Sequence, residues 1–342
     1  MGRVDAAGVG IDYELVGQGQ PVVLLHGWPD SGPELAPSGT GAGRGRVPGG
    51  GTRPAWLRAL RETGGRRGLF ASGSDGDVLA ILADLNIARA HLVGHDWGAA
   101  LVWQLALIAP GSVDHLVVLS VGHPGTFRRT LQQREKSWYM LLFLFPGIAE
   151  RWLSADNWAN FRTWARHPDA DEVIAELESA DSLTPGLNWY LANARPESWV
   201  QPPPQLPPVQ AATMGVWSTS DTSRTEIQMT DSAQNVAGPW RYERLDGPGH
   251  WMQLEAPEQV NALLLDFLPP DGDPSAIRRG ACRVTPAPGA GWCRLVTDGT
   301  AACEQTTSKH WLPDRHETRA CGHRRARLRD CGMDCHLHCG YG

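Results

Sequence analysis

The sequence predicts an α/β fold, in which a mostly parallel sheet is flanked by helices. Three observations predict it. Short apolar runs that suit buried strands recur along the chain, for example at residues 22–25 and 113–121. Segments with a helical period lie between such runs, for example at residues 77–85. One apolar run, at residues 92–93, passes through a glycine-flanked turn directly into a helical segment.

The composition allows one large α/β domain with an inserted subdomain. The chain has 342 residues, 42% of them hydrophobic and 15 of them Trp, which is ample for a core. Its net charge of −6 gives no reason to expect a nucleic acid partner. It contains no run of 18 apolar residues, and residues 1–5 lack the apolar segment of a signal peptide. We therefore expect a cytoplasmic protein that does not bind membranes.

Two strands are expected near the N-terminus. Residues 11–15 alternate between apolar and polar side chains, and residues 22–25 are all apolar. The Gly-Gln-Gly sequence at 17–19, followed by Pro21, predicts a hairpin turn that joins them. The second strand leads into His26, Gly27, Trp28 and Pro29. The backbone N–H of Trp28 is then a candidate oxyanion donor, although this motif taken alone also suits a simple turn.

Residues 32–74 show neither a strand period nor a helix period and are rich in Gly, Arg and Pro. Only residues 56–60 hint at one helical turn, so we expect this region to be irregular. Lys occurs only at positions 136 and 309, although Lys and Arg together total 31. We hypothesise that residues 33–75 and 270–342 come from a shifted reading frame of a GC-rich gene. An undisturbed frame at both junctions of the resequenced gene would refute this hypothesis.

The turn at residues 94–98 organises the predicted site. Its sequence matches the strand-to-helix corner G-x-S-x-G, with Asp96 in place of Ser. Gly94 and Gly98 suit this corner because a side chain at either position would collide with the backbone. The following helix directs its free N–H groups toward Asp96, and the N–H of Trp97 is a second candidate oxyanion donor. An Asp at this point also suits an ordinary helix N-cap.

The rest of the chain predicts a helical cap inserted into the sheet domain. Helical segments dense in aromatic residues fill residues 125–210 and end in a Pro-rich linker. The predicted organisation is a core of residues 1–124 and 211–268, a cap of residues 125–210 and a tail of residues 269–342.

Two polar residues follow the late strands of the predicted core. Strand patterns return at residues 212–217 and 240–245, and a helix at 257–268 closes the domain. Asp221 follows the first of these strands, and His250 lies in the loop after the second. The chain order is therefore an acid at the turn, a second acid and then a histidine.

The tail holds all seven Cys residues and shows no usable periodicity. The spacing of Cys331, Cys335, His336, His338 and Cys339 resembles metal-ligand spacing only loosely, because paired C-x2-C knuckles are missing. We therefore expect a disordered tail, and we expect neither a metal nor a cofactor.

These motifs together resemble those of the epoxide hydrolases of the α/β-hydrolase fold. Their order along the chain is that of α/β-hydrolases. The core motifs are His26-Gly27-Trp28-Pro29, Gly94-His95-Asp96-Trp97-Gly98, Asp221 and Gly249-His250-Trp251. The cap motifs are Trp138-Tyr139, Phe145-Pro146-Gly147-Ile148-Ala149-Glu150 and Asn188-Trp189-Tyr190. The resemblance covers residues 8–31 and 77–268.

The resemblance implies that a small hydrophobic epoxide and water react to give a vicinal diol. Asp96 would attack an epoxide carbon and form a covalent ester. Tyr139 and Tyr190, carried over from the family, would donate hydrogen bonds to the epoxide oxygen.

A second step would release the diol. His250, oriented by Asp221, would activate water to cleave the ester. The N–H groups of Trp28 and Trp97 would stabilise the tetrahedral oxyanion.

Two alternative functions stay open from the sequence. A haloalkane dehalogenase resembles this set in using an Asp followed by Trp, but that family typically has Asn after His-Gly, where this chain has Trp28. An inactive hydrolase-like binding protein is the non-enzyme alternative, which the irregular residues 32–74 favour.

Overall fold

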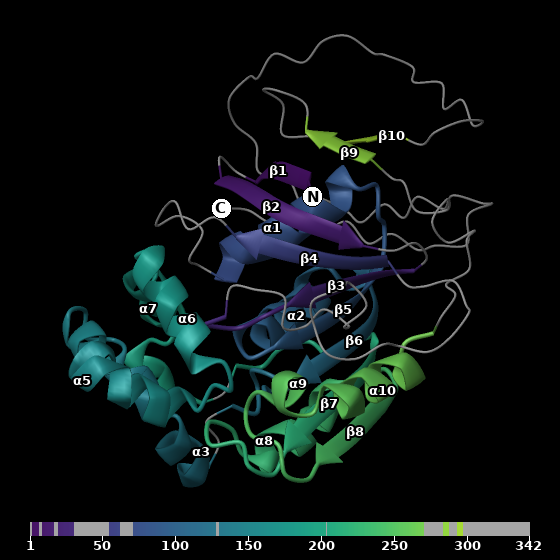
Figure 1. The fold of residues 1–342 in the computed structure, drawn as a ribbon. Helices are drawn as coiled ribbons and strands as arrows, with labels where there is room; N and C mark the ends of the chain where they lie inside the picture. Colours follow the sequence, from purple (N-terminus) through teal and green to yellow (C-terminus); the bar gives the residue numbers. More distant parts are fainter. Residues whose placement is uncertain are drawn as a thin grey trace, which may run out of the picture. The chain divides into compact units, whose positions relative to one another are not determined.

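An eight-stranded sheet organises the described part of residues 1–296. The computed structural model describes residues 2–6, 9–16, 20–30, 55–61, 71–127, 130–202, 204–269, 283–286 and 293–296. The strand order is β1-β2-β4-β3-β5-β6-β7-β8 (Figure 1). The strands are β1 (Gly2–Ala6), β2 (Val9–Val16), β3 (Pro21–Leu25), β4 (Ala55–Arg61), β5 (Ala90–His95), β6 (Val113–Leu119), β7 (Ala212–Ser218) and β8 (Trp240–Leu245). Only the pairs β1–β2 and β2–β4 of this sheet are antiparallel, which confirms the predicted mostly parallel sheet.

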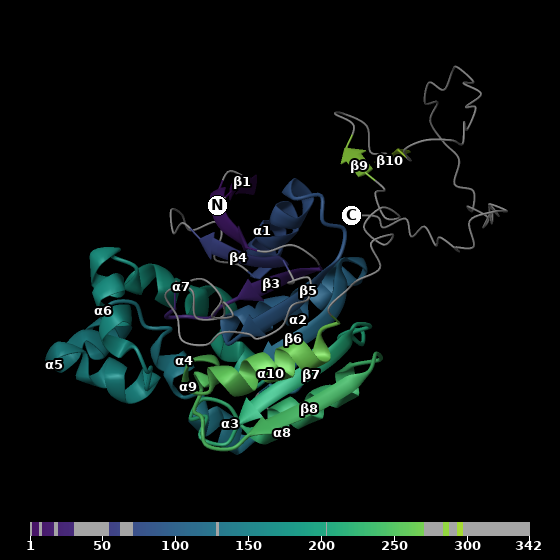
Figure 2. The ribbon, with the colours of Figure 1, turned by 45° about the vertical axis from the view of Figure 1, so that its right-hand side comes forward.

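Helices cover both faces of this sheet (Figures 1 and 2). Side chains alternate along each strand, so Val23 and Leu25 of β3 pack with α1 and α2, whereas Val22 and Leu24 pack with α9 and α10. The helices are α1 (Ala71–Asp84), α2 (Trp97–Ile108), α3 (Leu131–Lys136), α4 (Tyr139–Leu142), α5 (Ile148–Ala165), α6 (Ala170–Ser179), α7 (Leu183–Asn193), α8 (Glu226–Thr230), α9 (Met252–Glu255) and α10 (Pro257–Phe267). None of the helices in the described ranges is both long and apolar enough to cross a membrane.

Helices α3 to α7 follow one another between β6 and β7 and form a helical insertion. Both ribbon views show α5, α6 and α7 grouped together, apart from α1, α2 and α10 (Figures 1 and 2). The insertion has its own buried cluster, with Phe143, Leu153 and Phe161 almost fully enclosed. Such a cluster explains the density of aromatic residues that the sequence shows here. The assignment of residues 125–210 to a separate cap domain stays a prediction.

Strand β4 corrects the expectation that residues 32–74 are irregular. It spans residues 55–61, including the residues that hinted at a helical turn, and α1 begins within the same region at Ala71. The hairpin predicted at 17–21 was also wrong, because β4 lies between β2 and β3. Hydrogen bonding to a strand on each side stabilises β4, and that contribution leaves no periodic pattern in the sequence. The other residues of the 32–74 region that precede Ala71 lie outside the described residues.

Two further strands are described within the tail, whose disorder stays a prediction. Strand β9 (Arg283–Pro286) pairs antiparallel with β10 (Cys293–Val296). Strands of four residues are too short to give a periodic signal, which explains why the sequence did not predict them. The loosely metal-like Cys and His positions 331–339 lie outside the described residues.

Candidate active site

The turn between β5 and α2 holds Asp96 in an uncommon backbone conformation. Its φ is 51° and its ψ is −117°, in a region that residues other than glycine seldom occupy. The Asp96 side chain makes no capping hydrogen bond to α2, so the alternative of an ordinary N-cap was wrong. A Cβ added to Gly98 would lie 2.0 Å from the Leu25 carbonyl oxygen, and one added to Gly94 would lie 2.4 Å from the Gly98 carbonyl oxygen. The predicted collisions at both glycines are therefore confirmed.

The three predicted catalytic side chains meet at the ends of three parallel strands. His250 Nε2 lies 3.5 Å from Asp96 Oδ2, and His250 Nδ1 lies 3.1 Å from Asp221 Oδ2. All three residues are buried. Because β5, β7 and β8 run parallel, the segments that follow them emerge at the same edge of the sheet. The arrangement places an imidazole between two carboxylates, one of which stands at the β5–α2 turn.

Three residues to which the sequence analysis gave no role support this imidazole. Ser120 donates a hydrogen bond to Asp221 Oδ2 at 2.8 Å. His95 Nε2 lies 2.9 Å from the His250 carbonyl oxygen, while Gln253 Nε2 lies 3.1 Å from His95 Nδ1. Burial and the nearby His250 lower the pKa of His95 to about 3, so it is neutral and donates through Nε2. The hydrogen bond from His95 therefore holds the backbone of His250 in place.

Charges within the cluster shift its pKa values strongly. Burial alone would lower the pKa of His250, but the charge and hydrogen bond of Asp221, together with Asp96, raise it to about 9. Burial would raise the pKa of Asp96, but the hydrogen bond and charge of His250 and the charge of Arg224 lower it to about 2. The pKa of Asp221 is lowered in the same way against its burial. Near neutral pH the cluster therefore holds two carboxylates and a protonated imidazole.

The two oxygens of Asp96 have different surroundings. Oδ2 faces His250, whereas a Cβ added to Gly27 would lie 2.6 Å from Oδ1. Oδ1 is buried and accepts no hydrogen bond from the described residues. The N–H groups of Trp28 and Trp97 therefore do not bond Oδ1 in this structure, and their assignment as oxyanion donors stays a prediction.

Tyr139 and Tyr190 lie together in the buried cluster of the helical insertion. Their ring centroids are 6.2 Å apart, and both residues are at most 3% exposed. Tyr190 also contacts Trp28 and Trp97, the residues that follow His26-Gly27 and Asp96. The predicted tyrosines of the insertion are thus packed against the predicted motifs of the sheet.

Arg224 contacts both the Asp96 side of the site and the tyrosines of the insertion, and the sequence analysis did not identify it. Its Nη2 lies 3.6 Å from Asp96 Oδ2, and its Nη1 donates a hydrogen bond of 3.0 Å to Tyr139 Oη. Arg224 is only 6% exposed, and its Nε has no hydrogen-bond partner among the described residues. Its position three residues after Asp221 was the available signal, but Arg is abundant in this chain.

Comparisons with known proteins identify the family of this chain. A family model described as alpha/beta hydrolase fold matches residues 70–257. The chain belongs to the α/β-hydrolase fold family. Epoxide hydrolase A of Mycobacterium tuberculosis is 28% identical over 320 residues, which cover 78% of this chain and 96% of that protein. Epoxide hydrolase 3 of Xenopus tropicalis is 28% identical over 213 residues, or 57% of each protein. A crystal structure of the Bacillus megaterium epoxide hydrolase with an inhibitor has a TM-score of 0.65 and 21% identity, covering 78% of this chain and 99% of that one.

A contact between the sheet and the insertion of this α/β-hydrolase follows the His26-Gly27-Trp28-Pro29 motif. Asp30 Oδ1 lies 2.8 Å from His167 Nε2, and both side chains are buried. His167 also packs against Trp251, beside His250. The helical insertion is therefore tied to the sheet at the active-site end.

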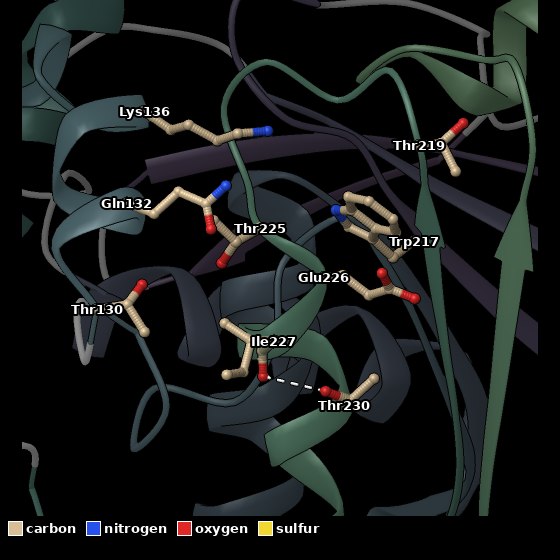
Figure 3. A pocket seen from close by; sticks show the side chains of 9 residues that line it. All are labelled: Thr130, Gln132, Lys136, Trp217, Thr219, Thr225, Glu226, Ile227 and Thr230. Carbon is tan, nitrogen blue, oxygen red and sulfur yellow. Dashed lines mark hydrogen bonds between the residues drawn. The ribbon is translucent and has the colours of Figure 1, made fainter.

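A cavity of about 510 Å³ is lined in part by Thr219 and Thr225, which lie in sequence on either side of Asp221 and Arg224 (Figure 3). Its lining comes from α3, β7, α8 and the loop after β7: Thr130, Gln132, Lys136, Trp217, Thr219, Thr225, Glu226, Ile227 and Thr230. Lys136 and Trp217 donate hydrogen bonds to the Arg224 carbonyl oxygen at 3.0 Å and 3.3 Å. Neither Asp96 nor His250 lines this cavity, so in this α/β-hydrolase it is distinct from the candidate active site.

Proposed function

We propose that this α/β-hydrolase is an epoxide hydrolase that converts a small hydrophobic epoxide and water into a vicinal diol. The observation that carries the proposal is the contact of His250 with both Asp96 and Asp221, at 3.5 and 3.1 Å. The names of the M. tuberculosis and X. tropicalis relatives support the same reaction. Aromatic rings of the insertion surround the site and favour a hydrophobic substrate.

The first step forms an ester at the β5–α2 turn, which acts as a nucleophile elbow. Oδ2 of Asp96 attacks an epoxide carbon, and the bond from that carbon to the epoxide oxygen breaks. The electron pair goes to the epoxide oxygen, which receives hydrogen bonds from Tyr139 and Tyr190 of the cap. Attack by an ionised carboxylate suits the low pKa of Asp96, about 2. Oδ1, on the side of Gly27, becomes the carbonyl oxygen of the ester.

The second step cleaves this ester with water. Esterification removes the charge of Asp96, which is one of the two charges that raise the pKa of His250. The imidazole therefore gives its proton to solvent water more easily once the ester has formed, and it becomes a base; it takes a proton back when Asp96 ionises again at the end of the cycle. Water gives a proton to His250 Nε2 and attacks the ester carbon. The N–H groups of Trp28 and Trp97 stabilise the oxyanion, an effect of about 3 kcal/mol per donor in comparable sites.

The proposal is tested by incubating the full-length protein with racemic styrene oxide and measuring the diol. We expect turnover by the wild-type protein and none by Asp96→Ala. Halide release from a chloroalkane without diol formation would instead indicate a haloalkane dehalogenase. A folded protein that gives neither product would indicate an inactive hydrolase-like protein. We retain the cytoplasmic location as part of this proposal.

A further inference from the structure

Arg224 is a buried cation that the two-step scheme above does not use. It lies 3.6 Å from the proposed nucleophile, Asp96, and 3.0 Å from Tyr139 Oη. We propose that Arg224 is a positioning residue that, through its hydrogen bond to Tyr139, makes Tyr139 rather than Tyr190 the group that protonates the epoxide oxygen. This inference rests on the proposed function and deepens it, because it assigns different roles to the two tyrosines.

The direction of the hydrogen bond between Arg224 and Tyr139 is the first reason for this assignment. A guanidinium has only donors, so Tyr139 Oη must accept the bond from Arg224 Nη1. The Tyr139 hydroxyl proton therefore points away from Arg224 and is available to a substrate oxygen. No hydrogen bond of the described structure links Tyr190 to a cation. Donation into the oxygen of a phenol strengthens its own O–H as a donor, because hydrogen bonds in a chain polarise one another.

The charge of the buried Arg224 guanidinium is the second reason to assign the proton donor as Tyr139. Before the reaction, the guanidinium has the Asp96 carboxylate as an anionic partner at 3.6 Å. Ester formation makes Asp96 neutral and would leave a buried cation without that partner, which is unfavourable. If Tyr139 gives its proton to the epoxide oxygen, the resulting tyrosinate lies within hydrogen-bond distance of Arg224. The negative charge thus passes from Asp96 to Tyr139 while Arg224 keeps a partner throughout.

Atoms and charges balance over the cycle. One C–O bond of the epoxide breaks as the bond from Asp96 Oδ2 forms, and the released alkoxide takes the Tyr139 proton. In the second step, the oxygen of water enters the Asp96 carboxyl group as the ester C–O bond breaks. Of the two protons of water, one passes by way of His250 to the departing alkoxide, and the other returns to Tyr139.

The pKa shifts of the two tyrosines agree with this assignment. Burial raises the pKa of both phenols, but at Tyr139 the charge and hydrogen bond of Arg224 oppose that effect. The pKa of Tyr190 is raised well above its ordinary value by burial and by the charges of Tyr139 and Asp96, and a side-chain hydrogen bond with Trp97 and the charge of Arg224 oppose this rise only in part. Tyr139 is therefore the stronger acid of the pair.

The backbone of Arg224 is held independently of its side chain, so the side chain can be tested by substitution. Asp221 Oδ1 accepts hydrogen bonds from the backbone N–H groups of Ser223 and Arg224 at 2.7 and 2.9 Å. Lys136 and Trp217 donate to the Arg224 carbonyl oxygen. Arg224→Met should therefore keep the loop while removing the charge and the donors.

The test follows the ionisation of residue 139 directly. The full-length protein is prepared with difluorotyrosine at position 139, and its fluorine NMR shift is titrated with pH for Arg224, Arg224→Lys and Arg224→Met. We expect residue 139 to ionise at the lowest pH with Arg224 and at the highest pH with Arg224→Met, with Arg224→Lys between them. Arg241→Met is the control. Arg241 forms ion pairs with Glu243 and Asp266, which are not part of the candidate active site, so this substitution should leave the titration of residue 139 unchanged. If Arg224→Met does not fold, the difference between the titrations of wild type and Arg224→Lys tests the inference.

Rapid-quench kinetics complete the test in the unlabelled protein. Loss of a charge-assisted hydrogen bond predicts that Arg224→Met slows ester formation about 10- to 100-fold, with partial rescue by Arg224→Lys. Tyr139→Phe should slow ester formation more than Tyr190→Phe. An unchanged titration in both Arg224 variants, or a larger effect of Tyr190→Phe, would overturn the inference. The titration needs no turnover, so a protein that makes no diol would refute the proposed function without deciding the role of Arg224.

Discussion

Replacement of Asp221 by Asn should slow ester cleavage far more than ester formation. The change keeps the size of the side chain but removes a charge 3.1 Å from His250 Nδ1. At an effective dielectric constant of about 20, two charges at this separation interact by about 5 kcal/mol. Both side chains are at most 9% exposed, so water screens this interaction little. The pKa of His250 should fall toward its ordinary value, and the imidazole should lose its orientation.

Ester cleavage and ester formation should respond differently to Asp221→Asn. General-base catalysis contributes about 10²- to 10⁴-fold, so cleavage of the ester should slow by a factor in this range. Ester formation depends mainly on Asp96 and should change less. The alkylated protein should therefore accumulate during turnover of styrene oxide, and mass spectrometry of rapidly quenched samples measures the alkylated fraction.

Asp246→Asn is the matched control for this experiment. Asp246 pairs with Arg244, and its side chain is 80% exposed, so the substitution should leave both steps unchanged. Equal slowing of both steps in Asp221→Asn, with no accumulated ester, would contradict the reasoning about His250.

Three other predictions concern stability and packing. The raised pKa of His250, about 9 against an ordinary 6.5, stabilises the fold below pH 6.5, and this contribution is lost as pH rises through 9. Urea unfolding at a series of pH values measures how much more stable wild type is than His250→Gln. This difference in the free energy of unfolding should fall by about 3 kcal/mol between pH 6.5 and pH 9, and a constant difference would refute the raised pKa of His250. Asp30→Ala should lower the free energy of unfolding by about 1–3 kcal/mol because it leaves the buried Nε2 donor of His167 without its acceptor; an unchanged urea midpoint would contradict this. Gly27→Ala would bring a Cβ within 2.4 Å of Asp96 Cβ and should lower the rate of ester formation about 100-fold. Gly76→Ala, which meets nothing within 4 Å, should have no such effect, and equal rates in the two variants would refute the role of this contact.

The fold was predictable where strands are buried and bounded by clear turn signals. Strand β8 has the predicted bounds, residues 240–245, and β7 extends one residue beyond its prediction. Strand β4 was not predictable, because it is stabilised by pairing with β2 and β3, which are distant in sequence. Strand β1 was missed for a related reason: it is short, lies at the sheet edge and pairs only with β2.

The candidate site was predictable in its chain order but not in its supporting contacts. Turn chemistry identified the corner at Asp96, and the order of motifs led to Asp221 and His250. Ser120 and Arg224 were missed because their roles depend on contacts across the fold. Ser120 is 101 residues from Asp221, and Arg224 is 85 residues from Tyr139. Neither separation leaves a local pattern in the sequence.

The central claim is that the carboxylate of Asp96 becomes covalently bonded to the substrate. A single turnover of styrene oxide in heavy-oxygen water tests this claim most directly, with mass spectrometry of both the diol and the peptide that contains residue 96. We expect the label to enter the carboxyl group of Asp96 and the first diol to carry none, because water attacks the ester carbon. A labelled first diol with unlabelled Asp96 would mean that water opens the epoxide directly, and it would contradict the account.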